Sequence, residues 1–352
     1  MQNQALLEAI INTAIEKRVF PGAVLGVFKG GQSNILPFGR LTYEAASPAV
    51  TPETVYDVAS ITKSIPTSSI IISLLQEKKL ALDDQVITYL PELNNQYREQ
   101  VLIRHLLTYT FVIDLPKGLA SYGQTGAKNV MATIFSTPLA APPGQKYYYT
   151  NAPAIFLALI AERVTGQPLD RLAQELFFDP LGMKSTTFRP KEMKGIEIAP
   201  TEIDWRGQVR AEVHDEAAWA LFQAGIIPGN AGLFSTAGDL LRFMTMLIGG
   251  GRDQNQTYFQ PEYLELMSTN QIDPAIGSVG LGWEVDWSNL VQPNPQQRLI
   301  GKTGFTGCLV LADRRSETAM VLISNRTYPH RPDSPAAMNE VRRALIPLIF
   351  DL

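Results

Sequence analysis

Histidine and cysteine are scarce in this chain, which has three histidines and one cysteine among 352 residues. A single cysteine excludes an intrachain disulfide. Cys308 lies in an apolar run typical of a buried strand, so we expect a small core side chain there rather than a catalytic thiol. The histidines (His105, His214 and His330) are scattered and show no metal-ligand spacing. We therefore expect no metal and no other cofactor, and any chemistry has to come from other side chains.

Long apolar runs and basic clusters are also missing. No stretch of about 20 apolar residues is present that would span a membrane, and the net charge is −4 without a Lys/Arg run. Nucleic acid is thus a poor partner, and a small-molecule substrate is the better expectation. The N-terminus lacks the basic and apolar regions of a signal peptide. We expect a cytoplasmic protein, although an exported chain cut at its processed end would look the same.

The pattern of apolar residues predicts strands toward both ends of the chain and helices in the middle. Such an α+β layout suggests an antiparallel sheet built from both ends, flanked by terminal helices, with an inserted, mostly helical region. We predict one catalytic unit over 1–352, with a sheet part at about 1–59 and 231–352 and a helical part at about 60–230. The expected strands are 22–28, 33–38, 280–287, 298–302, 307–312 and 318–325; the expected helices include 60–80, 103–109, 130–136, 152–165, 169–177, 236–247 and 338–350.

The most informative motif is Ser-Ile-Thr-Lys at 60–63. On a helix this spacing puts Ser60 and Lys63 on one face, with their Cβ atoms about 5–6 Å apart. A lysine so placed can take the proton of a serine nucleophile without any histidine. Taken alone, the tetrapeptide fits an ordinary helix start better, with Ser60 as the N-cap and Lys63 in solvent. Pro66 should bend the helix that follows.

Two further motifs supply parts that a Ser-Lys pair lacks. Tyr149-Thr150-Asn151 offers a phenol that can shuttle protons and an amide that can hold a substrate carbonyl and orient a neighbouring lysine such as Lys63. Lys302-Thr303-Gly304 ends a predicted strand, whose edge can pair with an extended substrate. The backbone N–H that follows, at Phe305, can form half of an oxyanion hole. Considered alone, Tyr149-Thr150-Asn151 fits an aromatic loop packed on the core. Lys302-Thr303-Gly304 alone fits an edge strand whose lysine prevents pairing with another chain.

In this order, Ser-x-x-Lys, Tyr-x-Asn and Lys-Thr-Gly resemble the motifs of the serine β-lactamase and penicillin-binding protein superfamily. The resemblance is to the class C β-lactamase-like branch, which includes D-alanyl-D-alanine carboxypeptidases and esterases. It extends over nearly the whole chain, from Phe20-Pro21-Gly22-Ala23 to Ser324-Asn325-Arg326. It implies a β-lactamase/transpeptidase-like fold and a serine hydrolase that forms an acyl-enzyme.

The resemblance also implies a role for each motif residue. Ser60 would be the nucleophile, Lys63, alone or together with Tyr149, its general base, and Tyr149 the proton donor to the leaving group. The backbone N–H groups of Ser60 and Phe305 would form the oxyanion hole. The substrate-binding residues would be Asn151, Lys302, Thr303, Gly304 and Phe305, with Lys302 binding a substrate carboxylate or tuning Tyr149.

One departure concerns substrate preference. Family members usually continue His-Thr-Ser-Gly where this chain has Tyr109-Thr110-Phe111-Val112, which indicates a reshaped loop beside the cleft.

The resemblance implies that the substrate is an ester or amide: a β-lactam, a D-amino-acid peptide or a small carboxylic ester. The alternative is a penicillin-binding or sensor protein that is acylated without efficient turnover. The motifs are the same in both cases, and the two differ in deacylation.

Overall fold

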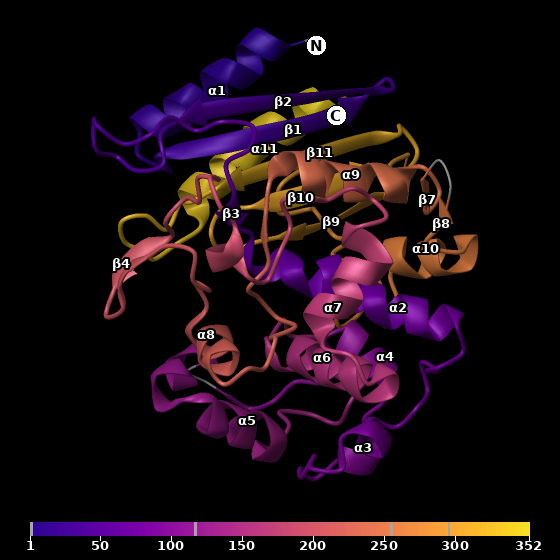
Figure 1. Cartoon of the computed structure of the whole chain (residues 1–352). Helices are drawn as coiled ribbons and strands as arrows, with labels where there is room; N and C mark the ends of the chain where they lie inside the picture. Colours follow the sequence, from indigo (N-terminus) through magenta and orange to yellow (C-terminus); the bar gives the residue numbers. More distant parts are fainter. Residues whose placement is uncertain (1–2, 116–117, 254–255, 295) are drawn as a thin grey trace.

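An antiparallel five-stranded sheet forms the upper part of the computed structural model, which describes residues 3–115, 118–253, 256–294 and 296–352 (Figure 1). The strand order is β2-β1-β11-β10-β9, so the N-terminal hairpin lies beside strands from the C-terminal end. The predicted α+β class is therefore confirmed. The strands are β1 (Gly22–Lys29), β2 (Gln32–Gly39), β9 (Leu299–Thr303), β10 (Leu309–Asp313) and β11 (Thr318–Ser324).

Helices cover both faces of this sheet because its strands carry apolar side chains on both. Residues such as Leu25 and Leu322 point to the face covered by the terminal helices α1 (Gln4–Glu16) and α11 (Ala336–Phe350), which pack on each other. Val24 and Val321 point to the other face, where α9 (Ala237–Ile248) packs. Alternation along each strand sorts its side chains between these two layers.

The helical region lies below the sheet (Figure 1) and comes mainly from the middle of the chain. Most predicted helices are present with shifted ends. Three were not predicted: α3, α8 and α10. The bounds are α2 (Ser69–Gln76), α3 (Val86–Tyr89), α4 (Ile103–Leu107), α5 (Ala127–Ser136), α6 (Ala152–Thr165), α7 (Leu169–Ala173), α8 (Glu216–Gln223) and α10 (Pro261–Ser268). Short strand pairs are β3 (Tyr56–Asp57) with β6 (Phe234–Ser235), β4 (Glu202–Asp204) with β5 (Gly207–Val209), and β7 (Arg252–Asp253) with β8 (Gln256–Thr257).

Two predicted elements were wrong in form. The helix expected at 60–80 is broken into η1 (Ala59–Lys63), η2 (Ser64–Ser68) and α2. Ile65 has extended backbone angles (φ −115°, ψ 107°), as a residue before proline prefers, so Pro66 breaks the helix there. The strand expected at 280–287 is a loop with one bridge, between Glu284 and Gly301. Gly282 has φ +74°, which turns the chain instead of extending it.

Cys308 is a buried core residue, as predicted. Burial raises the pKa of its thiol to about 11, so the reactive thiolate is disfavoured. Within the ranges that the structure describes, no helix combines the length and apolar character needed to cross a bilayer.

Candidate active site

Ser60 lies at the junction between the sheet and the helical region, in the first turn of η1. Ala59, directly before it, has φ +48°, an unfavourable conformation for a residue with a Cβ. The buried carboxylate of Asp57 holds this turn, since Oδ1 accepts from the N–H of Ala59 at 2.8 Å and Oδ2 from the N–H of His214 at 2.8 Å. The chain is thereby fixed with the Ser60 side chain only partly buried.

Lys63 is fully buried, and its Nζ donates to Ser60 Oγ at 2.7 Å and to the carbonyl oxygen of Asn230 at 2.9 Å. Burial is the main cause that lowers the pKa of Lys63 to about 7, and the positive charge of Lys302 lowers it further. Near neutral pH much of Lys63 is therefore uncharged. An uncharged lysine at hydrogen-bond distance from a serine hydroxyl can accept its proton.

The phenol of Tyr149 also forms a hydrogen bond with the Ser60 hydroxyl. Its ring faces two lysines: Lys302 Nζ is 3.9 Å and Lys63 Nζ 5.1 Å from the ring centroid. Burial and the negative charge of Glu284 raise the pKa of Tyr149 well above its ordinary value of 10. The phenol keeps its proton at neutral pH, so it is placed to donate it rather than to act as a base.

Asn151 is near this group but does not contact Lys63. Its Nδ2 donates to Asp215 Oδ2 at 3.0 Å, and Asp215 in turn caps α8 by accepting from the N–H of Ala218. The amide of Asn151 is thus oriented by a helix cap. The expected orientation of Lys63 by Asn151 falls instead to the carbonyl of Asn230.

Lys302 is completely buried within β9, and its Nζ donates to Glu284 Oε1 at 2.6 Å. Burial disfavours its charge, but the carboxylate of Glu284 outweighs this and the pKa of Lys302 is raised. The ring of Tyr109 also faces its ammonium group, at 5.2 Å. The lysine is enclosed by these groups and does not project into solvent.

Strand β9 and the turn after it run directly beside the segment that leads into Ser60. A Cβ on Gly304 would lie 2.4 Å from the carbonyl oxygen of Val58, so only glycine permits this approach. Thr303 ends β9 opposite Leu309. Phe305 follows in the turn, with its side chain 46% exposed. The close packing of Gly304 on Val58 places the turn that contains Phe305 beside the segment that leads into Ser60.

The structure thus brings the three predicted motifs to one place. It also adds four residues that the motifs did not reveal: Asp57, Tyr109, Asp215 and Glu284. Asp57 is three residues before Ser60, and its proximity could have drawn attention to it. Glu284 is 18 positions before Lys302 in sequence and meets it only because Glu284 and Gly301 exchange two backbone hydrogen bonds (3.0 and 3.1 Å).

The histidines take no part in this group. The imidazole of His214 stacks on Phe305, with 5.6 Å between ring centroids, and burial lowers its pKa to about 3. His105 Nδ1 accepts from the N–H of Leu102 at 3.1 Å and therefore has a structural role. The backbone N–H of His214 donates to Asp57.

One cluster of carboxylates among the described residues has the spacing of a metal site, and it consists of Glu202, Asp204 and Glu216. Arg331 forms ion pairs with the two glutamates, and Arg206 pairs with Asp204. The negative charges are therefore compensated by arginine. We interpret the cluster as an ion-pair network that ties the β4–β5 hairpin to α8.

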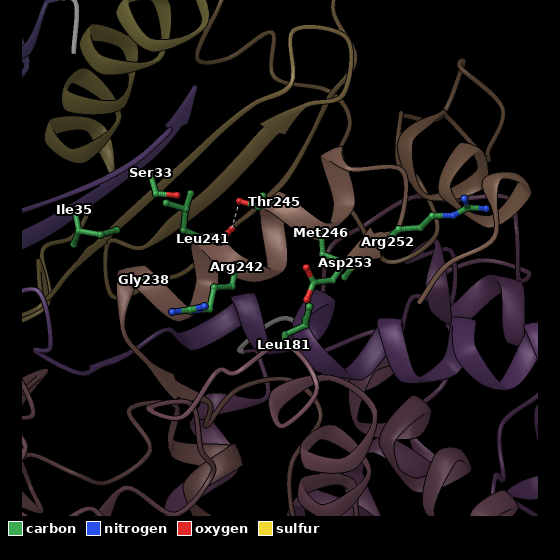
Figure 2. A pocket seen from close by; sticks show the side chains of 10 residues that line it. All are labelled: Ser33, Ile35, Leu181, Gly238, Leu241, Arg242, Thr245, Met246, Arg252 and Asp253. Atoms are coloured by element: carbon green, nitrogen blue, oxygen red, sulfur yellow. Dashed lines mark hydrogen bonds between the residues drawn. The ribbon is translucent and has the colours of Figure 1, made fainter. Parts of the chain in front are cut away.

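A pocket of about 530 Å³ opens beside Tyr149 and Asn151, which form part of its wall. The rest of the wall combines apolar side chains, such as Val112, Ile113, Leu115 and Leu119, with the charged side chains of Asp114 and Lys146. A second pocket, of about 370 Å³, lies between β2 and α9 (Figure 2) and is lined by residues such as Leu241, Arg242 and Thr245. As far as the structure is described, none of the residues around Ser60 line the second pocket. The first is the one that can take a substrate group.

A model of the beta-lactamase family matches residues 7–344 of the chain. The chain belongs to the beta-lactamase family. A candidate D-alanyl-D-alanine carboxypeptidase of Escherichia coli strain K12 is 30% identical over 315 residues, covering 80% of this chain and 71% of that protein. The family resemblance predicted from the motifs is confirmed, and with it the assignment to the serine hydrolases.

Solved structures of other proteins share the fold of this beta-lactamase family member. An octameric penicillin-binding protein homologue from Pyrococcus abyssi superposes with a TM-score of 0.80 at 23% identity, covering 100% of this chain and 78% of that one. EstCE1, a hydrolase with promiscuous acyltransferase activity, gives a TM-score of 0.76 at 19% identity, covering 96% and 97%. The predicted β-lactamase/transpeptidase-like fold is thereby confirmed.

Replacing Asp57 with alanine should destabilise the protein by about 2–4 kcal/mol, because two buried N–H groups lose a charged acceptor. Urea unfolding followed by circular dichroism measures this loss. The Asp57→Asn variant is the control: it keeps one acceptor oxygen and should fall between wild type and Asp57→Ala. Equal stability of all three proteins would show that Asp57 does not hold the turn before Ser60.

Proposed function

We propose that the protein hydrolyses an ester or amide through an acyl-enzyme on Ser60, with the whole chain acting as one catalytic unit. The observation that carries the proposal is the pair of groups beside the Ser60 hydroxyl. Lys63, with its pKa lowered to about 7, lies 2.7 Å from Oγ, and Tyr149, with its pKa raised, bonds to the same hydroxyl. Because the pKa of one group is lowered and that of the other is raised, Lys63 is suited to act as the base and Tyr149 as the acid.

In acylation, Ser60 Oγ forms a bond to the substrate carbonyl carbon while uncharged Lys63 takes its proton. The resulting oxyanion would be stabilised by the N–H groups of Ser60 and Phe305. Tyr149 protonates the leaving oxygen or nitrogen as its bond to carbon breaks, and the proton held by Lys63 restores the phenol. In deacylation, water attacks the acyl carbon and gives up a proton to this Lys63–Tyr149 pair, and Ser60 leaves as the hydroxyl.

Among substrates, we rank small esters and peptide-like amides above β-lactams. The E. coli relative, a candidate D-alanyl-D-alanine carboxypeptidase, supports an amide substrate, and the hydrolase EstCE1 shares the fold alone. The apolar side chains in the pocket beside Tyr149, such as Val112 and Leu119, support a substrate with an apolar group. No observation favours acylation without turnover, and that alternative is decided by the lifetime of the adduct.

A fluorophosphonate probe tests the nucleophile. We expect intact-mass analysis to show one adduct per chain, mapped to Ser60 by peptide mass spectrometry, and no adduct on Ser60→Ala. Ser73→Ala is the matched control, since Ser73 bonds a helix carbonyl and should not be needed for labelling. Equal labelling of the Ser60→Ala variant would refute the proposal. A p-nitrophenyl ester whose acyl group stays on Ser60 for hours would instead indicate a binding protein.

A further inference from the structure

Arg326 lies two residues after β11 and contacts the turn that contains Phe305. This turn, at residues 304–307, is closed by the N–H of Gly307, which donates to the carbonyl oxygen of Gly304 at 3.1 Å. A trans peptide holds its N–H opposite its C=O, so the bond at Gly304 also sets the direction of the Phe305 N–H. The geometry of the 304–307 turn therefore determines where the N–H proposed for the oxyanion hole points.

Two bonds from Arg326 hold the central residues of this turn. Its side-chain Nε donates to the carbonyl oxygen of Phe305 at 2.8 Å, and its backbone N–H donates to that of Thr306 at 2.9 Å. Its guanidinium also lies 4.9 Å from the centroid of the Phe305 ring. Thr306 Oγ1 donates in turn to the carbonyl oxygen of Asp57 at 2.8 Å. The turn is thus held by Arg326 and tied to the segment that precedes Ser60.

The close approach of Arg326 depends on the glycine that ends the turn. Gly307 has φ +109°, which favours glycine. A Cβ at this position would lie 2.2 Å from Ser324 Oγ and 3.2 Å from Cβ and Cγ of Arg326. Any larger residue would therefore separate the turn from the arginine side chain.

Packing alone does not account for an arginine at position 326. The side chain is 7% exposed, and no ion pair joins it to a carboxylate anywhere in the described ranges. A buried guanidinium without a carboxylate costs free energy, so an apolar side chain would suit a purely structural role better. Arg331 differs, since it lies 5.9 Å from the Phe305 ring but pairs with Glu202 and Glu216. Of these two arginines, Arg326 is the one whose side chain bonds the backbone of the turn.

We infer that Arg326 is a positioning residue for the reaction, which holds the 304–307 turn so that the Phe305 N–H points at the carbonyl oxygen of a substrate on Ser60. The inference rests on the proposed function, because it takes Ser60 as the nucleophile and the Phe305 N–H as a donor to the oxyanion. In this role Arg326 acts through Phe305 and does not contact the substrate. Its removal should weaken stabilisation of the oxyanion, which develops only in the transition state.

A thionoester isolates this effect. In p-nitrophenyl pentanoate the negative charge develops on oxygen, whereas in its thiono analogue it develops on sulfur, a weak hydrogen-bond acceptor. Arg326→Met keeps the length of the side chain but has no donor. We expect its kcat/KM on the ester to fall about tenfold, since loss of a whole oxyanion donor costs about 10²–10³-fold. The thionoester should lose less, so the ratio of ester to thionoester kcat/KM should fall severalfold.

Arg331→Met is the matched control, because Arg331 faces the same ring without bonding the turn, and it should keep the wild-type ratio. A purely structural defect would lower both rates equally. An unchanged ratio in folded Arg326→Met, or an equal fall in Arg331→Met, would therefore overturn the inference. If Arg326→Met does not fold, Arg326→Lys decides, since it keeps the charge but has a methylene in place of Nε. Its ratio should also fall, and a wild-type ratio would overturn the inference.

Ser60→Ala separates this inference from the proposed function. Hydrolysis that persists in Ser60→Ala refutes Ser60 as the nucleophile, and with it the proposed function. Hydrolysis that depends on Ser60, with the same ester-to-thionoester ratio in Arg326→Met and the wild type, refutes only the positioning role of Arg326. Circular dichroism of each variant shows whether it is folded before the rates are compared.

Discussion

Replacing Lys63 with alanine should slow acylation of Ser60 by about 10³-fold, within the range of a general base. The reason is the 2.7 Å contact between Lys63 Nζ and Ser60 Oγ together with the pKa of about 7, which leaves an uncharged amine beside the nucleophile. Stopped-flow measurement of p-nitrophenol release in the first turnover gives the acylation rate. An unchanged rate in Lys63→Ala would refute Lys63 as the base.

The pH dependence of acylation provides a second readout of the same residue. In the wild type the rate should rise with pH and reach half of its plateau near pH 7, as Lys63 loses its proton. The Lys63→Arg variant keeps a long cationic side chain that does not deprotonate. It should therefore be as slow as Lys63→Ala, and neither variant should show the limb near pH 7. A limb that persists in both would belong to another group.

The free energy of unfolding should also depend on the titration of Lys63. The pKa of Lys63 is lowered from its ordinary 10.5 to about 7 in the folded protein. Between these pH values the unfolded chain binds more protons at this position than the folded one, so the free energy of unfolding rises with pH. We expect the wild type to gain stability between about pH 7 and 10 relative to Lys63→Ala, measured by urea unfolding at each pH.

The sequence motifs located the site because each carries its chemistry within a few residues. Ser60 and Lys63 are close in any helical turn, and the burial that lowers the pKa of Lys63 depends on how the rest of the chain packs over it. The positive charge of Lys302 also lowers this pKa, but burial is the larger cause. The local spacing thus predicted the contact between Ser60 and Lys63, whereas the lowered pKa of Lys63 could be inferred only from the folded structure.

Glu284 shows what local patterns could not predict. The segment around it has the composition of a strand, and it was interpreted as one. Gly280 lies against the carbonyl of Met267, Gly282 lies against Ser68, and the chain turns at Gly282, so the segment becomes a loop that places a carboxylate on Lys302. Long-range contacts of two glycines decided this outcome. Lys302 is thereby one half of an ion pair with Glu284, and its two expected roles, binding a substrate carboxylate or tuning Tyr149, remain predictions.

The sheet was predicted more completely, for a physical reason. Its strands alternate apolar side chains between two helical layers, and hairpins such as β10–β11 join neighbours in sequence. The unpredicted helix α8 begins directly after its N-cap residue Asp215, and an aspartate before an apolar run is a local signal that could have been used. Asp215 also accepts a hydrogen bond from Asn151. One residue therefore accounts both for the helix start that was not predicted and for a site residue that was not predicted.

Replacing Tyr149 with phenylalanine should separate its role from that of Lys63, because the effect depends on the leaving group. The ring would still face Lys302 and Lys63, and only the hydroxyl that bonds Ser60 is lost. For an alkyl ester, whose alkoxide must be protonated to leave, we expect kcat/KM to fall by about 10²–10³-fold. For a p-nitrophenyl ester the fall should be much smaller, since p-nitrophenolate departs unprotonated.

Tyr109→Phe is the matched control for this comparison. Tyr109 stacks on Tyr149 with 5.0 Å between ring centroids and also faces Lys302, but it has no contact with Ser60 in the described structure. Loss of its hydroxyl should leave the ratio of alkyl to p-nitrophenyl ester rates unchanged. Equal losses on both esters in Tyr149→Phe would contradict the acid role and leave Tyr149 as a group that only positions Ser60. A loss that is selective for the alkyl ester in Tyr149→Phe, but not in Lys63→Ala, would identify Tyr149 as the acid and Lys63 as the base.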